Sequence, residues 1–167
     1  QLNALEILYL FGNQLTGTLR EDLWRLTALE QLYMHNNLLE GTISDKVGRL
    51  TTLKQLYLYG NKLVGSIPSE VGALSKLEII YLQNNQLTGS IPDEVGQVDA
   101  LGILSLYENR LTGTLPSSMG KLTSISELWV HTNRLVGTLP IEISRLSRLR
   151  ICLLQNNFFT GRLDGVF

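Results

Sequence analysis

The sequence lacks most of what catalysis, metal binding and membrane insertion require. Its single cysteine, Cys152, excludes an internal disulfide and a cysteine-rich zinc site. The 14 basic and 15 acidic residues give a net charge of −1, which does not favour nucleic acid or an anionic membrane as a partner. No apolar run reaches the roughly 18 residues of a membrane span. We therefore expect no membrane contact within this stretch.

The chain does contain a strict internal repeat. Asparagine recurs every 24 residues without insertion or deletion, and glycine recurs with the same step from Gly17 to Gly161. The repeated asparagines are Asn13, Asn37, Asn61, Asn85, Asn109, Asn133 and Asn157. A fixed period of this length is typical of a solenoid. We expect a single domain over residues 1–167, built from seven repeats in phase.

Apolar residues follow the same period. When each block is numbered 1 to 24 with asparagine at 13, positions 2, 5, 8, 10, 15, 19 and 23 are apolar. This pattern resembles the leucine-rich repeat, LxxLxLxxNxL, over the whole chain. Segments such as "LVGSIPSEVGAL" resemble the plant-type extracellular repeat, LxGxIPxxLGxL, and all four prolines occupy position 20. Runs such as "LYL" are also similar to repeats of algal and protist proteins.

The pattern predicts an α/β solenoid in which neighbouring repeats share one core. Positions 8 to 12 are expected to form a parallel sheet on the concave face, and the residues after position 20 one turn of 3₁₀ or α helix on the convex face. The asparagines should satisfy backbone groups buried inside the turn. The plant-type resemblance implies a second short strand at positions 16 to 19 and a horseshoe or superhelical shape.

The chain begins and ends within the repeat pattern. Leu2 and Leu5 stand at the start, and Phe167, the last residue, falls on a core position. Because solenoids need polar caps, we interpret the chain as a section of a longer protein that lacks both caps. Trp24 replaces the glycine usual at position 24 and is expected to be exposed, packing against a preceding repeat.

No catalytic or metal-binding residues are expected. His35 and His131 share position 11 but lie four repeats apart, which separates them by about 19 Å in a parallel sheet. Glu127 is on the same strand as His131, about 13 Å away along the backbone. Cys152 occupies a leucine position and should be a buried, inert thiol. We predict a non-enzymatic protein without cofactors.

The candidate binding residues point outward from the sheet. Positions 9 and 11 carry all six tyrosines and one of the two tryptophans. The predicted binding residues are Tyr9, Phe11, Tyr33, His35, Tyr57, Tyr59, Tyr81, Gln83, Tyr107, Trp129, His131 and Gln155. Position 7 adds Ile7, Gln31, Gln55, Ile79, Ile103, Glu127 and Ile151. Tyrosine and tryptophan bind well when half exposed, because they are large, rigid and tipped with a polar group.

A structural explanation of these aromatic residues stays open. Tyrosine suits strands, and equivalent residues of neighbouring strands stabilise one another. Position 9 is nearly constant and is compatible with either role. Position 11 varies more, so we place specificity there and at position 12. Position 12 holds Gly12, Asn36, Gly60, Asn84, Glu108, Thr132 and Asn156.

The prediction for function is recognition of a protein or peptide on the concave face. The resemblance implies the extracellular part of a receptor-like signalling protein at the cell surface, in which a membrane helix and a kinase sometimes follow. One alternative is a secreted enzyme inhibitor, as in solenoids that resemble polygalacturonase-inhibiting proteins. Carbohydrate binding is another, because aromatic faces suit sugar rings. Ice binding by the Thr-Gly-Thr segments at positions 16 to 18 is a further one, although Glu40, Val64, Val136 and Arg162 interrupt them.

Overall fold

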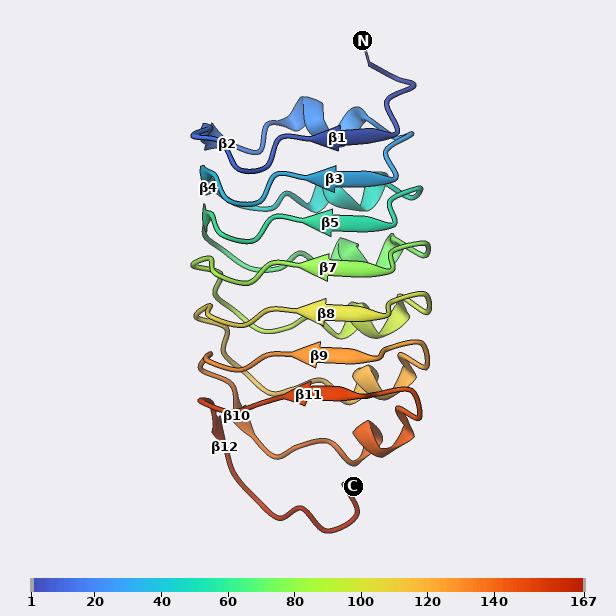
Figure 1. Cartoon of the computed structure of the whole chain (residues 1–167). Helices are drawn as coiled ribbons and strands as arrows, with labels where there is room; N and C mark the ends of the chain where they lie inside the picture. The colour runs from blue at the N-terminus through green and yellow to red at the C-terminus, as the bar shows by residue number, and fades with distance from the viewer. Residues whose placement is uncertain (1, 167) are drawn as a thin grey trace.

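A computed structural model describes residues 2–166, in which one long parallel sheet covers one side of the molecule (Figure 1). Its seven strands are stacked in chain order. They are β1 (Ile7–Tyr9), β3 (Gln31–Tyr33), β5 (Gln55–Tyr57), β7 (Ile79–Tyr81), β8 (Ile103–Ser105), β9 (Glu127–Trp129) and β11 (Ile151–Leu153). Equivalent residues lie side by side, as in the pairing of Tyr33 with Tyr57. The step of 24 residues in the sequence is therefore one strand spacing in the sheet.

Within residues 2–166, six 3₁₀ helices form the opposite side, behind the sheet in Figure 1. They are η1 (Glu21–Arg25), η2 (Asp45–Arg49), η3 (Ser69–Ala73), η4 (Asp93–Gln97), η5 (Ser117–Lys121) and η6 (Ile141–Arg145). Four of them begin directly after the proline of position 20, and Pro68 stands before η3 with φ −70°. Proline suits this place because its fixed φ leads into the turn without needing an N–H donor. None of the described helices is long and apolar enough to cross a membrane.

The strands of the main sheet cover positions 7 to 9, so the predicted bounds of 8 to 12 were wrong. Parallel hydrogen bonding does continue beyond them, since Leu58 N–H donates to Tyr81 O at 2.9 Å and Gly60 N–H to Gln83 O at 3.0 Å. Regular strand geometry ends because position 12 takes a left-handed conformation, with φ +64° at Gly60.

The second strand expected from the plant-type pattern is present in five repeats and falls between positions 14 and 18. One small parallel sheet contains β2 (Thr16–Thr18), β4 (Leu38–Gly41) and β6 (Lys62–Leu63). Another contains β10 (Val136–Gly137) and β12 (Phe158–Phe159). Gly41 lies in β4 at φ +80°, and a Cβ there would stand 2.8 Å from the Thr18 methyl group of the preceding repeat. Two features therefore require glycine at position 17: the backbone has a positive φ, and a Cβ would come too close to the preceding repeat.

The core is continuous through the stack, as expected for shared burial between repeats. Leu56 and Leu58 are fully buried, whereas Tyr57 between them points away from the core. Full burial of one such leucine contributes about 1.5–3 kcal/mol. Since each leucine packs against the repeats on either side, no repeat buries its apolar residues alone. Phe167, also expected at a core position, lies outside the described residues.

Trp24 is completely buried, which contradicts its predicted exposure and its assignment to a preceding repeat. Its indole belongs to the same core cluster as Leu29 and Val47, so residues within the described chain cover it. Glycine at this position elsewhere allows close helix stacking: a Cβ on Gly96 would lie 2.4 Å from the Ser118 carbonyl oxygen. The sequence could not show that η1 accommodates an indole where η2 to η5 accommodate no side chain.

Candidate functional site

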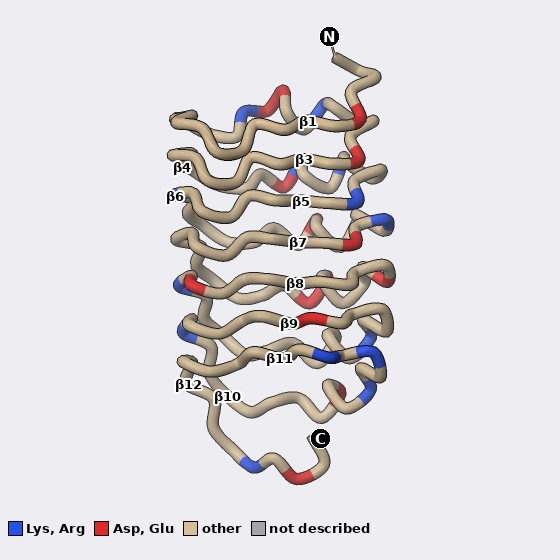
Figure 2. The backbone as a smooth tube through the Cα atoms, viewed as in Figure 1, with Lys and Arg blue, Asp and Glu red and all other residues tan. Residues whose placement is uncertain are grey.

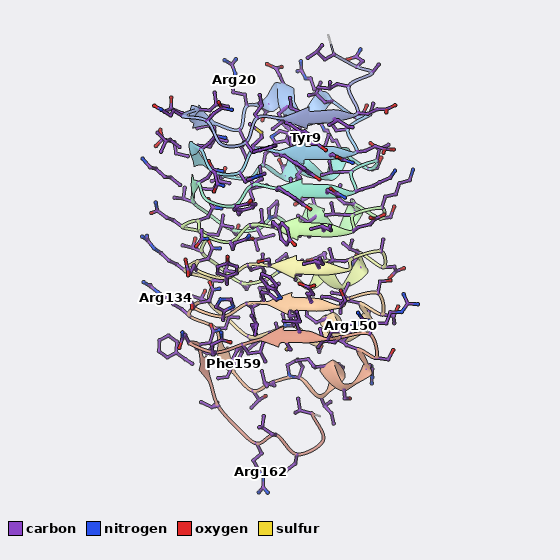
Figure 3. The ribbon with its side chains drawn as sticks, viewed as in Figure 1. Tyr9, Arg20, Arg134, Arg150, Phe159 and Arg162 are labelled. Carbon is purple, nitrogen blue, oxygen red and sulfur yellow. The ribbon has the colours of Figure 1, made fainter. Side chains whose placement is uncertain are left out.

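The outward residues at positions 7, 9 and 11 of the main sheet form one continuous surface, which we call the sheet face. Figure 3 shows that the side chains crowd over the strands, with Tyr9 labelled at the N-terminal end. Exposure differs widely among the predicted binding residues. Tyr9, Phe11 and Gln155 are exposed, and His35 and Gln83 are buried. The partly buried ones are Tyr33, Tyr57, Tyr59, Tyr81, Tyr107, Trp129 and His131.

The tyrosines of position 9 stack on one another. The ring centroids of Tyr9 and Tyr33 lie 4.3 Å apart, and those of Tyr33 and Tyr57 lie 4.2 Å apart, with nearly parallel planes. The strand spacing of about 4.8 Å makes this possible, because successive rings rise from adjacent strands. Tyr9 and Tyr33 also donate their hydroxyl hydrogens to Gln31 and Gln55 of the following repeat. These bonds give the glutamines of position 7 a structural role.

Position 11 forms a second stack beside the first. Phe11 and His35 are parallel at 4.6 Å, and His35 and Tyr59 follow at 4.3 Å. Burial between these rings lowers the pKa of His35, because the imidazolium would lose its hydration. His35 is therefore neutral at pH 7 and serves as a stacking residue, not as a charged one.

Stacking decides which part of each ring a partner could meet. Parallel neighbours occupy the faces of Tyr33 and His35, so mainly ring edges and hydroxyl groups point outward. Burial, followed by the neighbouring Tyr57, raises the pKa of both Tyr33 and Tyr59. These hydroxyls stay protonated at physiological pH; that of Tyr33 donates to Gln55, and that of Tyr59 can donate to a partner. The surface is suited to edge contacts and hydrogen bonding more than to face-on stacking.

The two stacks end in the middle of the sheet face. Tyr81 is tilted by 44° from Tyr57 and does not continue the parallel stack. Ser105 and Gln83 then replace aromatic residues in positions 9 and 11. Aromatic residues resume with Tyr107, Trp129 and His131, where Tyr107 and His131 are parallel at 4.5 Å. We call these three residues the C-terminal aromatic cluster.

Backbone geometry explains position 12, where specificity had also been expected. All seven residues of this column have positive φ, from +52° at Glu108 to +67° at Gly12. Glycine and asparagine adopt this conformation most easily. The prevalence of these two residues therefore has a structural explanation in the left-handed turn, and specificity at position 12 stays a prediction.

The repeated asparagines connect neighbouring repeats by hydrogen bonds. Asn61 donates to the carbonyl oxygens of Met34, Leu58 and Tyr59, at 3.0–3.3 Å. Its side-chain oxygen accepts from the N–H of Leu39 in the preceding repeat at 3.1 Å. Most members of the ladder repeat this arrangement and are buried, but Asn13 at the edge is exposed. The ladder positions the strand ends from which the outward residues rise.

Charge is almost absent from the sheet face, as Figure 2 shows by the tan centres of the strands. The exception is Glu127 on β9, the one charged residue in the three outward columns. From the sequence, Glu127 was expected among the outward residues of position 7 and on the strand of His131, but its isolation was not predicted. The signal was present, since the other members of position 7 are isoleucine or glutamine. Among residues 2–166, no cluster of three potential metal ligands occurs, and burial raises the pKa of the Cys152 thiol.

Comparison with known proteins establishes the family. The family profile described as a leucine-rich repeat region matches residues 8–158. The chain therefore belongs to the leucine-rich repeat family, with plant-type repeats. No curated protein matches it.

Many solved structures share the fold. The ectodomain of the plant membrane receptor kinase GASSHO1/SCHENGEN3 from Arabidopsis thaliana, in complex with CASPARIAN STRIP INTEGRITY FACTOR 2, has a TM-score of 0.89 and 34% identity; the match covers 93% of this chain and 22% of that one. The Arabidopsis receptor kinase HAESA, in complex with the peptide hormone IDA and the co-receptor SERK1, has a TM-score of 0.75 and 32% identity, with 95% and 30% covered. The chain thus spans less than a third of either receptor chain.

The same fold also occurs in a protein that is described as ice-binding and not as a receptor. A plant ice-binding protein has a TM-score of 0.71 and 24% identity, and the match covers 96% of this chain and 67% of that one. At this identity the likeness concerns the fold alone. A functional conclusion therefore depends on the residues of the sheet face.

Proposed function

We propose that the chain is a recognition module that binds an extended peptide along the sheet face, as the ligand-binding part of a receptor-like protein at the cell surface. The observation that carries this proposal is the sheet face itself, a row of aromatic edges and protonated hydroxyls with a single charged residue. Partly exposed tyrosine and tryptophan combine apolar area with hydrogen bonding at low entropic cost. The complex of HAESA with a peptide hormone supports the same class of partner.

An extended peptide fits this surface better than a sugar does. The rings of position 9 lie about one strand spacing apart, and their hydroxyls follow one another across the sheet. A sugar ring would instead need a free aromatic face, which the parallel stacks of Tyr9, Tyr33 and Tyr57 largely occupy. The stacking thus favours a peptide over the carbohydrate alternative.

A peptide display library panned on the chain tests the proposal. We expect a selected peptide to bind at least about tenfold more weakly to Tyr59→Ala or Trp129→Ala, since such residues dominate binding energy when partly buried. Tyr57→Ala should weaken binding less, because its ring is held within the stack. Phe158→Ala is the matched control, because it removes an aromatic side chain that is 64% exposed outside the sheet face.

Two outcomes would contradict the proposal. Either the peptide binds all three sheet-face variants as tightly as it binds the native chain, or Phe158→Ala weakens binding as much as they do. Thermal unfolding of each variant separates lost contacts from lost structure. Sequencing the gene beyond this chain tests the receptor assignment, which predicts a membrane span downstream.

Ice binding is a second candidate, favoured by one specific feature of the side of the solenoid. Position 18 presents an exposed column of hydroxyl residues across six repeats. They are Thr18, Thr42, Ser66, Ser90, Thr114 and Thr138. Measuring inhibition of ice recrystallisation by the chain and by Thr114→Lys tests this candidate, and inhibition unaffected by the lysine would contradict it.

A further inference from the structure

Glu127 is an unpaired carboxylate on a surface that otherwise lacks charge. It is partly buried on β9 between Ile103 and Ile151, its partners in the adjacent strands. No ion pair joins Glu127 to another residue of the described chain, including Arg150, which precedes β11. A carboxylate among apolar and aromatic neighbours favours a cationic partner, because water screens the charge less there.

Aromatic residues lie on the same face as this carboxylate. Trp129 lies two residues further along the same strand, about 7 Å away, and its side chain emerges on the same face. Its ring is tilted by 40° from that of Tyr107 at a centroid distance of 6.1 Å, so no parallel neighbour covers it as in the N-terminal stacks. Burial, then Tyr57 and Glu127, raise the pKa of Tyr81, which places its hydroxyl within electrostatic range of the carboxylate.

Two buried oxygen atoms of the sheet face have no hydrogen-bond partner in residues 2–166. They are Oγ of Ser105, which is fully buried, and Oε1 of Gln83, whose residue is only 7% exposed. Ser105 lies in register between Tyr81 and Trp129, on the strand adjacent to Glu127. Unpaired buried acceptors are costly and call for a donor. The Nε1–H of Trp129 is also unpaired and calls for an acceptor.

We propose that Glu127, Trp129, Tyr81 and Ser105 form a subsite for an arginine side chain of the bound peptide. The guanidinium group is planar, carries five donors and stacks on aromatic rings, so it matches a carboxylate, the Ser105 oxygen and a tryptophan ring together. Ser105 is fully buried, so the arginine reaches its Oγ only if the tilted ring of Tyr81 is displaced. This inference rests on the proposed peptide recognition and specifies its chemistry.

Titration of the ¹⁵N-labelled chain with Nα-acetyl-arginine amide tests the subsite directly. The protein has two indole N–H signals, and Trp24, buried in the core, provides an internal reference for Trp129. We expect a saturable shift of the Trp129 signal alone. Nα-acetyl-citrulline amide, which has nearly the same shape without the charge, should bind at least about tenfold more weakly.

Glu127→Gln should weaken the binding of the arginine probe by a similar factor, whereas the matched control Glu78→Gln should leave that binding unchanged. Glu78 is exposed and precedes β7 at the margin of the sheet face. Equal binding of arginine and citrulline amides, or undiminished binding to Glu127→Gln, would overturn the subsite. A shift of both indole signals would also overturn it, since it would indicate a general change in the fold.

Panning the peptide library on the native chain and on Glu127→Gln separates this inference from the proposed function. Enrichment of arginine on the native chain alone supports both. Peptides that bind the sheet face without arginine enrichment, and equally to both proteins, overturn the subsite and leave peptide recognition standing. If the arginine probe binds through Glu127 but no peptide is selected, the cation subsite stands and the proposed peptide function fails.

Discussion

The side-chain nitrogen of Asn85 donates a hydrogen bond to the carbonyl oxygen of Leu58, 27 residues earlier in the chain, at 3.1 Å. The same nitrogen reaches the carbonyl oxygen of Leu82 at 3.1 Å, and the side-chain oxygen accepts from Leu63 N–H at 3.0 Å. One side chain thus satisfies buried backbone groups of two repeats. The residue that recurs every 24 positions in the sequence is thus the one that joins neighbouring repeats in the tertiary structure.

Asn85→Ala should lower the free energy of unfolding by about 3 kcal/mol or more, because it leaves several buried backbone groups unpaired. Since repeats contact only their neighbours, we expect the loss to reduce cooperativity around this repeat. Urea unfolding followed by circular dichroism measures both effects. Asn13→Ala is the matched control, because Asn13 is exposed and makes only two bonds, to Leu10 and Phe11. An unaltered midpoint for Asn85→Ala, or equal losses in both variants, would contradict this account.

His35 should make stability depend on pH in the mildly acidic range. Its folded pKa lies below its ordinary value of 6.5, so the unfolded chain takes up a proton first as the pH falls. The stability that neutral His35 contributes to the folded state is therefore present above about pH 6.5 and is lost as the pH falls below it. His35→Gln removes this titration and introduces a residue that position 11 already contains in Gln83 and Gln155. Urea unfolding between about pH 7.5 and 5.5 should show a smaller loss in the variant, and identical pH profiles would refute the prediction.

Thr132→Asn should stabilise the protein by about 1 kcal/mol, because a β-branched residue is strained in the left-handed conformation. Thr132 has φ +54°, and Asn84 occupies the equivalent position with the same φ. The reciprocal substitution Asn84→Thr should therefore destabilise by a comparable amount. Thermal unfolding of the two variants checks the pair. Shifts of the same sign would show that backbone conformation does not decide this position.

Trp24→Ala should cost about 3–5 kcal/mol, the range for removing a large buried aromatic side chain. The structure buries Trp24 completely, whereas Trp129 remains partly exposed. Trp129→Ala should therefore cost clearly less stability while affecting recognition. Equal losses in denaturant unfolding would mean that Trp24 is not part of the core in solution.

The sequence predicted most of the scaffold because the repeat samples each position seven times. The inward leucines, the turn after Pro68 and the parallel arrangement of strands followed from a pattern that no single repeat would have shown. The prediction failed at the strand bounds and at Trp24. Both depend on neighbouring backbone conformation, which a column of residue types does not reveal.

The candidate site was predictable in its location and not in its organisation. The sequence placed Tyr33, Tyr57 and Tyr59 on one outward surface. It could not show that stacking occupies the ring faces, because that depends on ring angles set by contacts between repeats. It also could not show that Ser105, on the strand adjacent to Glu127, retains an unpaired buried oxygen.

The sequence by itself determined the repeat length, the inward and outward positions and the family, because a strict period of 24 residues allows one pattern of shared burial. Tertiary structure decided which outward groups remain available to a partner. Rings brought together by adjacent strands cover one another, whereas Glu127 and Trp129 are left without such a neighbour. Availability depends on distances between side chains of different repeats, and these exist only once the repeats have stacked.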